Sequence, residues 1–471
     1  MNTLKAISKE DMDWIHESSL KILDETGVVF HSEEARAIFK DHGAKVNGQI
    51  VHMPKTMVNQ ALKASPATFR WHARNESYSV TVGDSNEKLL LQPNGGPVFI
   101  QDLDRGRRSA TLEDFSNIIK ICQACNEVAL VGSFPVEPGD VGQDQKHLHM
   151  MYETLKHTDK PVIAFEVSGV KARQMLDMVA IAMGGKDFLK DNYCVAVAAT
   201  PTSPLAFEPA SCETIIEFAR RNQPLFFTVA AMAGFSSPIS LIGTAILQNA
   251  EILAGITLTQ LVNPGNPVVY SNGSTVGNMK SGNFISASPE MMLIHLAGLQ
   301  MSLDYYHIPA RSMCGMTDAK SIDCQAGFET MQNLLMGALG GAHMVFECLG
   351  VLDAIMTTSY EKLIVDLEIV SRVMRLQEGI DTSDKEQVVN LIQEIGHQGD
   401  YLTHLDTLTH FRGRWLPAFS DWESYETWLE KGCEDLAAKA NRKFKEILAA
   451  APQALIDPTV DRALQDYIYQ N

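Results

Sequence analysis

Short apolar runs recur along the middle of this chain and predict its architecture. Eight of them can be distinguished: Lys88–Gln92 with its continuation Pro97–Ile100, Glu127–Phe134, Pro161–Val167, Tyr193–Thr200, Pro224–Ala230, Pro267–Ser271, Ile308–Cys314 and His343–Leu349. They are rich in Val, Ile, Phe and Ala, the composition of strands that are buried on both faces. From the second run onward they begin roughly 30 to 45 residues apart, which leaves room for one helix and two loops. The pattern predicts an α/β protein, a (β/α)8 TIM barrel whose functional site lies at the carboxyl ends of the strands.

The segment before the barrel, residues 1–85, is predicted to be a helical cap. Ser8 and Ser32 occupy N-cap positions before stretches of helical periodicity, and Met53-Pro54 precedes a third such stretch. Phe69–Val82 instead alternates between polar and apolar residues, which indicates a hairpin strand.

The barrel itself is expected over residues 86–355, and a C-terminal helical region packed on it over residues 356–471. Tyr360–Leu376 and Lys385–Ile395 are amphipathic, and further helical stretches follow to Tyr469. A tail of this kind either packs against the barrel or forms a subunit interface, so a homo-oligomer is expected.

Charge and cysteine content exclude several classes of function. The net charge is −18, which argues against nucleic-acid and anionic-membrane partners because both require a basic surface. Cys122 and Cys125 form one C-x-x-C pair without the second pair that a zinc site needs, so no metal is expected. No signal peptide and no uninterrupted apolar stretch of membrane-spanning length is visible, so a cytoplasmic protein is expected.

Arg311 is the first candidate for chemistry, because it lies within an apolar run that should be buried. Its planar guanidinium suits a carboxylate, which it can bind through two parallel hydrogen bonds. The alternative is a structural ion pair with Glu347 on the neighbouring strand. His343 and Glu347 are four residues apart and are expected on one face of that strand, with Glu347 nearer the site as a general base or cation partner.

Aromatic and polar side chains near the predicted strand ends are the remaining candidates. Ring faces can hold a quaternary ammonium group by cation–π attraction, although aromatics in barrel strands more often fill the core. The substrate-binding candidates of these types are Phe99, Phe165, Tyr270, Asn272 and Phe346. Walker, G-x-S-x-G and strand-associated G-x-G-x-x-G motifs are absent, so nucleotide binding and serine hydrolysis have no support in the sequence.

Three segments resemble the trimethylamine methyltransferase family. They are Gly315–Glu329, Gly340–Asp353 running into Ser359–Asp366, and Tyr401–Arg412. The resemblance covers essentially the whole chain. It implies a (β/α)8 barrel that moves a methyl group from an amine to the cobalt of a corrinoid (cobalamin) presented by a cognate partner protein, with no cofactor bound permanently to the enzyme.

The chain departs from the trimethylamine enzymes of that family at one point. They use pyrrolysine in the barrel, whereas every position of this chain is a standard residue. It therefore resembles the branch without pyrrolysine, whose substrates are quaternary amines such as glycine betaine, proline betaine and carnitine. No catalytic residue is carried over from the family, because the residue that replaces pyrrolysine cannot be placed.

Two other functions remain open at the level of sequence. The first is a barrel lyase or aldolase for a phosphorylated substrate, in which Lys320 or another lysine would form a Schiff base and the loops at Gly315 and Gly350 would bind phosphate. The second is a betaine-binding protein without catalytic activity.

Overall fold

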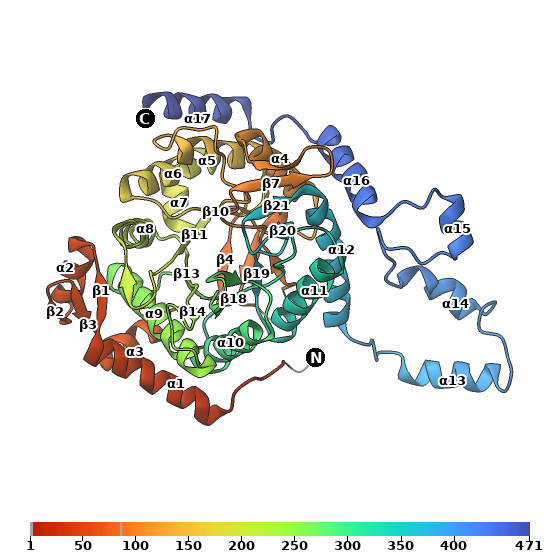
Figure 1. Ribbon diagram of the computed structural model, residues 1–471, viewed down its shortest axis with the longest axis horizontal. Coiled ribbons are helices and arrows are strands. Elements are labelled where there is room, and N and C mark those ends of the chain that lie inside the picture. The colour runs from red at the N-terminus through yellow and green to blue at the C-terminus, as the bar shows by residue number, and fades with distance from the viewer. Residues whose placement is uncertain (1–2, 85–86) are drawn as a thin grey trace.

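The computed structural model describes residues 3–84 and 87–471, and it is a barrel surrounded by helices (Figure 1). Eight parallel strands lie in the order β6-β19-β18-β15-β13-β11-β10-β9. Their bounds are β6 Leu90–Leu91, β9 Val131–Gly132, β10 Val162–Ala164, β11 Val195–Ala199, β13 Leu225–Val229, β15 Val268–Asn272, β18 Ala310–Met313 and β19 Met344–Phe346. The ring closes where the amides of Ala129 and Leu130 donate to the Leu91 carbonyl, at 3.1 and 3.0 Å. The predicted (β/α)8 barrel is confirmed.

The helices of the barrel follow the expected alternation. They are α4 Leu112–Ala124, α5 Lys146–His157, α6 Gly169–Ala182, α7 Lys186–Asp191, α8 Pro209–Arg220, α9 Leu241–Val262, α10 Pro289–Gln300, α11 Cys324–Leu339 and α12 Tyr360–Glu378. The start of α4 is fixed by a capping box between Thr111 and Asp114, and α10 starts at the N-cap Ser288. A π-helical turn, Met301–Tyr306, continues α10.

A hairpin plugs the amino-terminal end of the barrel. Strands β4 (Phe69–Trp71) and β5 (Val80–Val82) pair antiparallel, as the alternation in this segment predicts. Phe69, Trp71 and Val82 belong to one buried cluster with inward side chains of the barrel strands, including Phe226 and Met344. Because apolar side chains of the described residues fill this end, we expect a ligand to enter the barrel from the carboxyl end.

The N-terminal region, expected to be mainly helical, contains short strands as well as helices. The three expected helices form, as α1 Lys9–Lys21 with a π-helical end Ile22–Thr26, α2 Glu33–Asp41 and α3 Lys55–Ala64. Between them β1 (Val28–Phe30), β2 (Lys45–Asn47) and β3 (Ile50–His52) form a small sheet with β12 (Ala206–Phe207), and a 3-10 turn, Glu76–Tyr78, precedes β5. The expected boundary with the barrel, at residues 85 and 86, lies outside the described residues.

The same region packs beside the barrel rather than over its mouth, with α1 and α3 against the outer face of α9 (Figure 1). This placement explains why α9 is mainly apolar and is buried on nearly all sides. In the described part of the chain α9 is also the one helix long and apolar enough to cross a membrane, and 83% of its apolar window is buried inside the protein. It is therefore a core helix of the fold.

Two small sheets flank the mouth, because the chain leaves the carboxyl ends of the strands through them. One has the order β20-β21-β7-β8, with β7 Phe99–Asp102, β8 Gly106–Ser109, β20 Val351–Leu352 and β21 Thr357–Ser359. The other has the order β14-β16-β17, with β14 Met232–Ala233, β16 Thr275–Gly277 and β17 Phe284–Ile285. The predicted continuation of the first barrel strand, Pro97–Ile100, is thus part of a separate sheet.

The C-terminal region divides into helices that pack on the barrel and an excursion that does not. Helix α12 lies between α11 and α16 and acts as the eighth barrel helix. Helices α16 (Leu436–Ala450) and α17 (Pro458–Gln470) cover α4, α12 and α6, whereas α13 (Lys385–Ile395), α14 (Leu405–His410), the 3-10 turn Phe411–Gly413 and α15 (Tyr425–Glu430) extend sideways from the barrel (Figure 1).

Candidate functional site at the carboxyl end of the barrel

The side chain of Arg311 lies inside the barrel and is only 2% exposed. Its Nε donates to Ser271 Oγ at 2.7 Å, Nη1 to Gln92 Oε1 at 2.7 Å and Nη2 to Thr228 Oγ1 at 2.8 Å. These bonds use three of the five N–H donors of the guanidinium. One N–H on each terminal nitrogen therefore remains for a further acceptor.

Aromatic rings cover the faces of this guanidinium. Its Cζ lies 3.9 Å from the ring centroid of Phe346 and 4.6 Å from that of Phe226. Burial lowers the pKa of Arg311 to about 9, which is still above neutrality, so the side chain keeps its charge. Within residues 3–84 and 87–471 no hydrogen bond or ion pair joins it to a carboxylate, and the interior of the barrel carries a positive charge held by neutral groups.

Glu347 lies at the carboxyl end of β19, where the chain turns away from the barrel. Its φ of 55° is in the left-handed region, which is uncommon for a residue with a side chain and is typical of functional sites. Its Oε2 accepts a hydrogen bond from the Gly95 amide at 2.9 Å, and a Cβ at Gly95 would lie 2.9 Å from Oε1 and 3.4 Å from Ser133 Oγ. Burial raises the pKa of Glu347 to about 8, against the opposing effects of the Gly95 amide and the Arg311 charge, so the carboxyl is mainly neutral at pH 7.

Two phenylalanines stand at the ends of neighbouring strands beside Ser133. The rings of Phe134 and Phe165 have their centroids 5.0 Å apart and are inclined by 33°. Phe165 is buried, and Phe134 is half-buried. Phe165 and Phe346 therefore lie at the carboxyl end of the barrel, as expected, although Phe346 already stacks on Arg311.

The structure directs Tyr270 and Asn272 away from the barrel interior. Tyr270 donates from its hydroxyl to Asn249 Oδ1 on α9 at 3.1 Å, and Asn272 Oδ1 accepts from Gln248 of the same helix at 2.9 Å. Side chains alternate along a strand, so the inward position of Ser271 between them turns both toward the helices. Neither residue is placed to touch a ligand in the barrel, contrary to the expectation from the sequence.

Phe99 and His343 are also separated from Arg311. The ring of Phe99, on β7, is covered by Arg107, whose Cζ lies 3.7 Å from the ring centroid. His343 accepts a hydrogen bond from the Ala310 amide at its Nδ1, at 3.2 Å. It does not share a strand face with Glu347, because β19 covers only Met344–Phe346 and the positive φ of Glu347 breaks the alternation.

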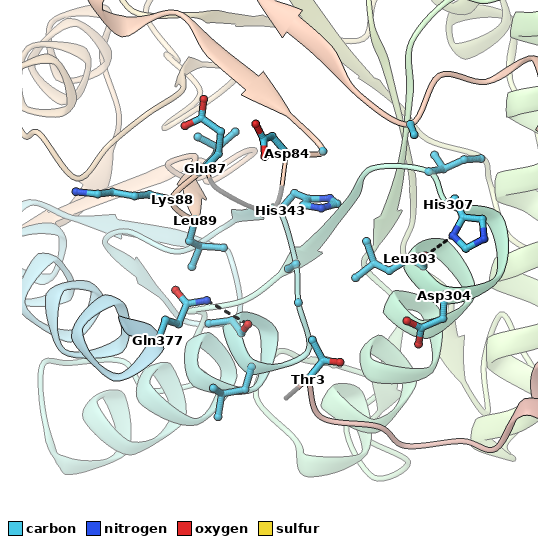
Figure 2. A pocket seen from close by; sticks show the side chains of 18 of the residues that line it. Thr3, Asp84, Glu87, Lys88, Leu89, Leu303, Asp304, His307, His343 and Gln377 are labelled. Carbon is cyan, nitrogen blue, oxygen red and sulfur yellow. Dashed lines mark hydrogen bonds between the residues drawn. The ribbon is translucent and has the colours of Figure 1, made fainter. Parts of the chain in front are cut away.

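A cavity of ≈ 550 Å³ surrounds His343 at the amino-terminal end of the barrel. Figure 2 shows His343 among Asp84, Lys88, Leu89 and His307, which line this cavity. Burial lowers the pKa of His343, so its imidazole is neutral at pH 7. The apolar plug separates this cavity from Arg311, and His343 therefore belongs to the end of the barrel opposite the candidate site.

Comparisons with known proteins agree with this geometry. A family model described as trimethylamine methyltransferase matches residues 1–471. The chain belongs to the trimethylamine methyltransferase family. It is 34% identical over 465 residues to the glycine betaine methyltransferase of Desulfitobacterium hafniense, covering 98% of this chain and 96% of that protein. It is 32% identical over 421 residues to the proline betaine:corrinoid methyltransferase of Eubacterium limosum, covering 88% of this chain and 86% of that protein.

Members of the family that act on methylamines are similar as well. The chain is 30% identical over 469 residues to the trimethylamine methyltransferase of Methanosarcina thermophila, covering 98% of this chain and 96% of that protein. The crystal structure of the Methanosarcina barkeri monomethylamine methyltransferase superposes with a TM-score of 0.55 at 11% identity, covering 94% of this chain and 89% of that one. That likeness concerns the fold alone. The family expected from the three sequence segments is confirmed, and so is a methyltransferase as the enzyme class.

The lyase alternative loses its support in this family member. The side chain of Lys320 is 71% exposed on the loop after β18, outside the barrel interior where a Schiff-base lysine would be needed. The Gly350 amide, expected to bind phosphate, already donates to Asp366 Oδ2 at 2.8 Å. A carboxylate at that amide opposes the binding of an anion.

Gln92 is polar at a predicted strand end and was a candidate by type, whereas Thr228, Ser271 and two buried carboxyls were not predicted from the sequence. Gln92, Thr228 and Ser271 come from three different strands, and their polar character at inward positions of apolar runs was the available signal. Burial raises the pKa of Glu166, whose Oε2 accepts from the Thr200 amide, and that of Glu251 on α9, in each case to about 7. In the described parts of the chain no group of three His, Cys, Asp or Glu side chains is arranged to hold a metal ion.

Proposed function

We propose that this protein transfers a methyl group from a carboxylate-bearing quaternary amine, such as glycine betaine, to the Co(I) of a corrinoid protein. The observation that carries the proposal is the charged guanidinium of Arg311, which is buried in the barrel and retains two N–H donors. Among the described residues no carboxylate forms a hydrogen bond or an ion pair with it, and Glu347 acts on its charge only at longer range. A buried cation held only by neutral groups is costly, and a substrate carboxylate would compensate it. The similarity to enzymes named for glycine betaine and proline betaine supports the same substrate class.

The geometry favours one orientation of such a substrate. Its carboxylate points down the barrel toward Arg311, and its ammonium group points toward the mouth. There the rings of Phe134 and Phe165 offer apolar and cation–π contacts to the methyl groups. Glu347, largely neutral at pH 7, can accept or donate a hydrogen bond without placing a full negative charge beside the ammonium group. The methyl groups are then presented to a reactant that arrives at the mouth.

A largely neutral site around the ammonium group suits the transfer of a methyl group from a quaternary amine. As the methyl carbon is transferred to Co(I), its bond to nitrogen breaks and the electron pair stays on nitrogen, which leaves a neutral tertiary amine. No proton has to be supplied to this leaving group. Strong stabilisation of the ammonium charge would oppose the reaction, because that charge disappears in the transition state. A neutral Glu347 and aromatic walls hold the group without this penalty, and orientation toward cobalt is the main contribution of the barrel.

We also propose that the corrinoid protein docks over the sheet β14-β16-β17 at the rim of the mouth. Ile239 and Met279 are both 66% exposed and Phe235 is 46% exposed. A Cβ at Gly234 would lie 2.9 Å from Ile239 Cδ1 and 3.0 Å from Met279 Sδ, so these side chains gather at one place. An exposed apolar group beside the carboxyl end of the barrel suits a partner that must approach that end.

The eight free cysteines, six of them buried, support a reducing, cytoplasmic setting for both proteins.

A spectroscopic assay tests the proposed reaction. The enzyme is mixed with Co(I) cobalamin or with the cognate corrinoid protein, and absorbance follows the conversion of Co(I) to methyl-Co(III). Glycine betaine, proline betaine, carnitine and trimethylamine are supplied in separate reactions. Conversion with a betaine and not with trimethylamine is expected. If none of the four supports conversion with the corrinoid protein, the proposal is wrong.

A further inference from the structure

The space beside Gly95, here called the Gly95 gap, lies at the carboxyl end of the barrel. Gly95 follows the first barrel strand, and its amide donates to Oε2 of Glu347, just beyond β19, at 2.9 Å. The next amide, that of Gly96, donates to the carbonyl of Phe134 beyond β9, also at 2.9 Å. These bonds fix Gly95 between the ends of the two strands that flank its own. Gly95 is only half-buried, so the gap is open to solvent.

Two oxygen atoms border the Gly95 gap. A Cβ on Gly95 would lie 2.9 Å from Glu347 Oε1 and 3.4 Å from Ser133 Oγ, and the next atom, Glu347 Cδ, is 4.0 Å away. Within residues 3–84 and 87–471 neither oxygen takes part in a hydrogen bond, and neither is sealed from solvent. Two unpaired oxygens beside one accessible space of methyl size indicate a place for a ligand.

The backbone directs both oxygens into the gap from strained positions. The φ angles of Ser133 and Glu347 are 60° and 55°, in the left-handed region that residues with a side chain rarely adopt. Gly132, before Ser133, has a φ of 113°, and a Cβ there would lie 2.4 Å from the carbonyl oxygen of Ile163, so this turn requires glycine. Strain at the ends of two strands that flank one gap is typical of a functional site.

We propose that the Gly95 gap receives one N-methyl group of the quaternary amine, with Ser133 Oγ and Glu347 Oε1 in contact with the hydrogens of that group. The inference rests on the proposed function and names residues that select its substrate. The methyl groups of a quaternary ammonium share its positive charge, so their C–H bonds interact favourably with oxygen lone pairs. The methyl group in the gap is not the one transferred. It fixes the rotation of the ammonium group, so that another methyl group faces the mouth.

The position of the gap fits the orientation proposed for the substrate. Gln92, which binds Arg311, precedes Gly95 by three residues. At no more than 3.6 Å for each residue, the Cα atoms of Gln92 and Gly95 are at most about 11 Å apart. A small betaine whose carboxylate binds Arg311 therefore brings its ammonium group to the level of the gap.

Titration calorimetry compares glycine betaine with dimethylglycine, which has one N-methyl group fewer. Gly95→Ala fills the gap, and the φ of Gly95 is not positive, so alanine introduces no backbone strain. One carbon more or less in a fitted pocket changes affinity by about 10–200-fold, so glycine betaine should bind at least about tenfold more weakly. Dimethylglycine can turn its N–H bond toward the added methyl group and should lose much less.

The matched control is Gly142→Ala in the loop after β9. It adds a methyl group where no atom lies within 4 Å, so it should change neither affinity. Ser133→Ala leaves the gap empty and removes one oxygen, and it should weaken the binding of glycine betaine a few-fold. This second variant decides the test if Gly95→Ala does not fold, as checked by denaturant unfolding.

The outcomes separate this inference from the proposed function. Equal losses for the two ligands in folded Gly95→Ala, or an unchanged affinity for glycine betaine in that variant or in Ser133→Ala, overturn the inference and leave the proposed function standing. If the unmodified protein binds no glycine betaine, both are overturned. A loss confined to glycine betaine in Gly95→Ala, with the weaker loss in Ser133→Ala, supports the inference, and this readout does not depend on methyl transfer.

Discussion

Replacement of Arg311 by methionine should separate recognition of the carboxylate from recognition of the ammonium group. The guanidinium has two N–H donors left after its bonds to Ser271, Gln92 and Thr228. A charge-assisted hydrogen bond contributes about 1.5–3 kcal/mol, so two of them set a loss of about 3 kcal/mol or more. At 1.4 kcal/mol for each factor of ten, glycine betaine should bind roughly 100-fold more weakly to the variant.

Choline is the matched control ligand, because it keeps the trimethylammonium group and lacks the carboxylate. Titration calorimetry of both ligands should show the loss for glycine betaine and little change for choline. Arg311→Lys retains the charge but loses the planar fork, so its affinity for glycine betaine should lie between those of the wild type and Arg311→Met. Arg311→Met leaves the polar partners of the guanidinium unpaired, and each unpaired group lowers the stability of the fold by about 1–3 kcal/mol. Denaturant unfolding therefore checks first that the variant is folded. Unchanged affinity for glycine betaine, or equal losses for both ligands in a folded variant, would refute the reasoning.

Three further predictions concern the carboxyl beside the site, the plug and the rim. Burial raises the pKa of Glu347 to about 8, so the native state holds this proton more tightly than the unfolded state. As pH rises from about 4.5 to 8 the carboxyl ionises in the unfolded state first, and the free energy of unfolding of the wild type therefore falls. Denaturant unfolding should therefore show Glu347→Gln near wild type at pH about 5 and more stable than wild type, by up to about 4 kcal/mol, at pH about 8; an equal difference at both would contradict the shift. Trp71→Ala should lower the free energy of unfolding by about 3–5 kcal/mol, because it empties the centre of the plug. Trp71→Phe should lower it by less than half as much, because phenylalanine keeps an aromatic ring there and removes a buried indole N–H that has no hydrogen-bond partner. Similar losses for the two variants would argue against the plug. Ile239→Asp with Met279→Asp should slow transfer to the corrinoid protein about tenfold or more and leave transfer to free Co(I) cobalamin unchanged, and equal effects on both acceptors would exclude this docking surface.

Those parts of the fold that depend on local signals were predictable from the sequence. The apolar runs, the N-cap residues Ser8 and Ser32 and the alternating segment Phe69–Val82 each report their own element, and all three are confirmed. The small sheet around β1 was missed because its strands have three residues each, too few for a periodicity. The end of the first barrel strand was missed because β6 has only two residues before the chain leaves for another sheet.

The site depends on register, which a single strand does not report. Arg311 and Ser271 are directly paired neighbours in the parallel sheet, so they face the same way, and Tyr270 and Asn272 must then face the helices. Without the pairing, Tyr270 and Asn272 were plausible ligands by residue type. The positive φ of Glu347 is similarly invisible in the sequence, and it separates this carboxyl from His343. The ion pair between Arg311 and Glu347, a reasonable expectation from charge alone, is replaced by three neutral acceptors from distant strands.

The most direct test of the central claim follows the methyl group itself. Glycine betaine with isotopically labelled methyl groups is incubated with the enzyme and its reduced corrinoid protein, and the label on cobalt and the amine product are both quantified. We expect one labelled methyl on cobalt for each dimethylglycine released, and a matching loss of both in the Arg311→Met variant at low substrate concentration. Release of dimethylglycine without label on cobalt, or binding of glycine betaine without either product, would contradict it.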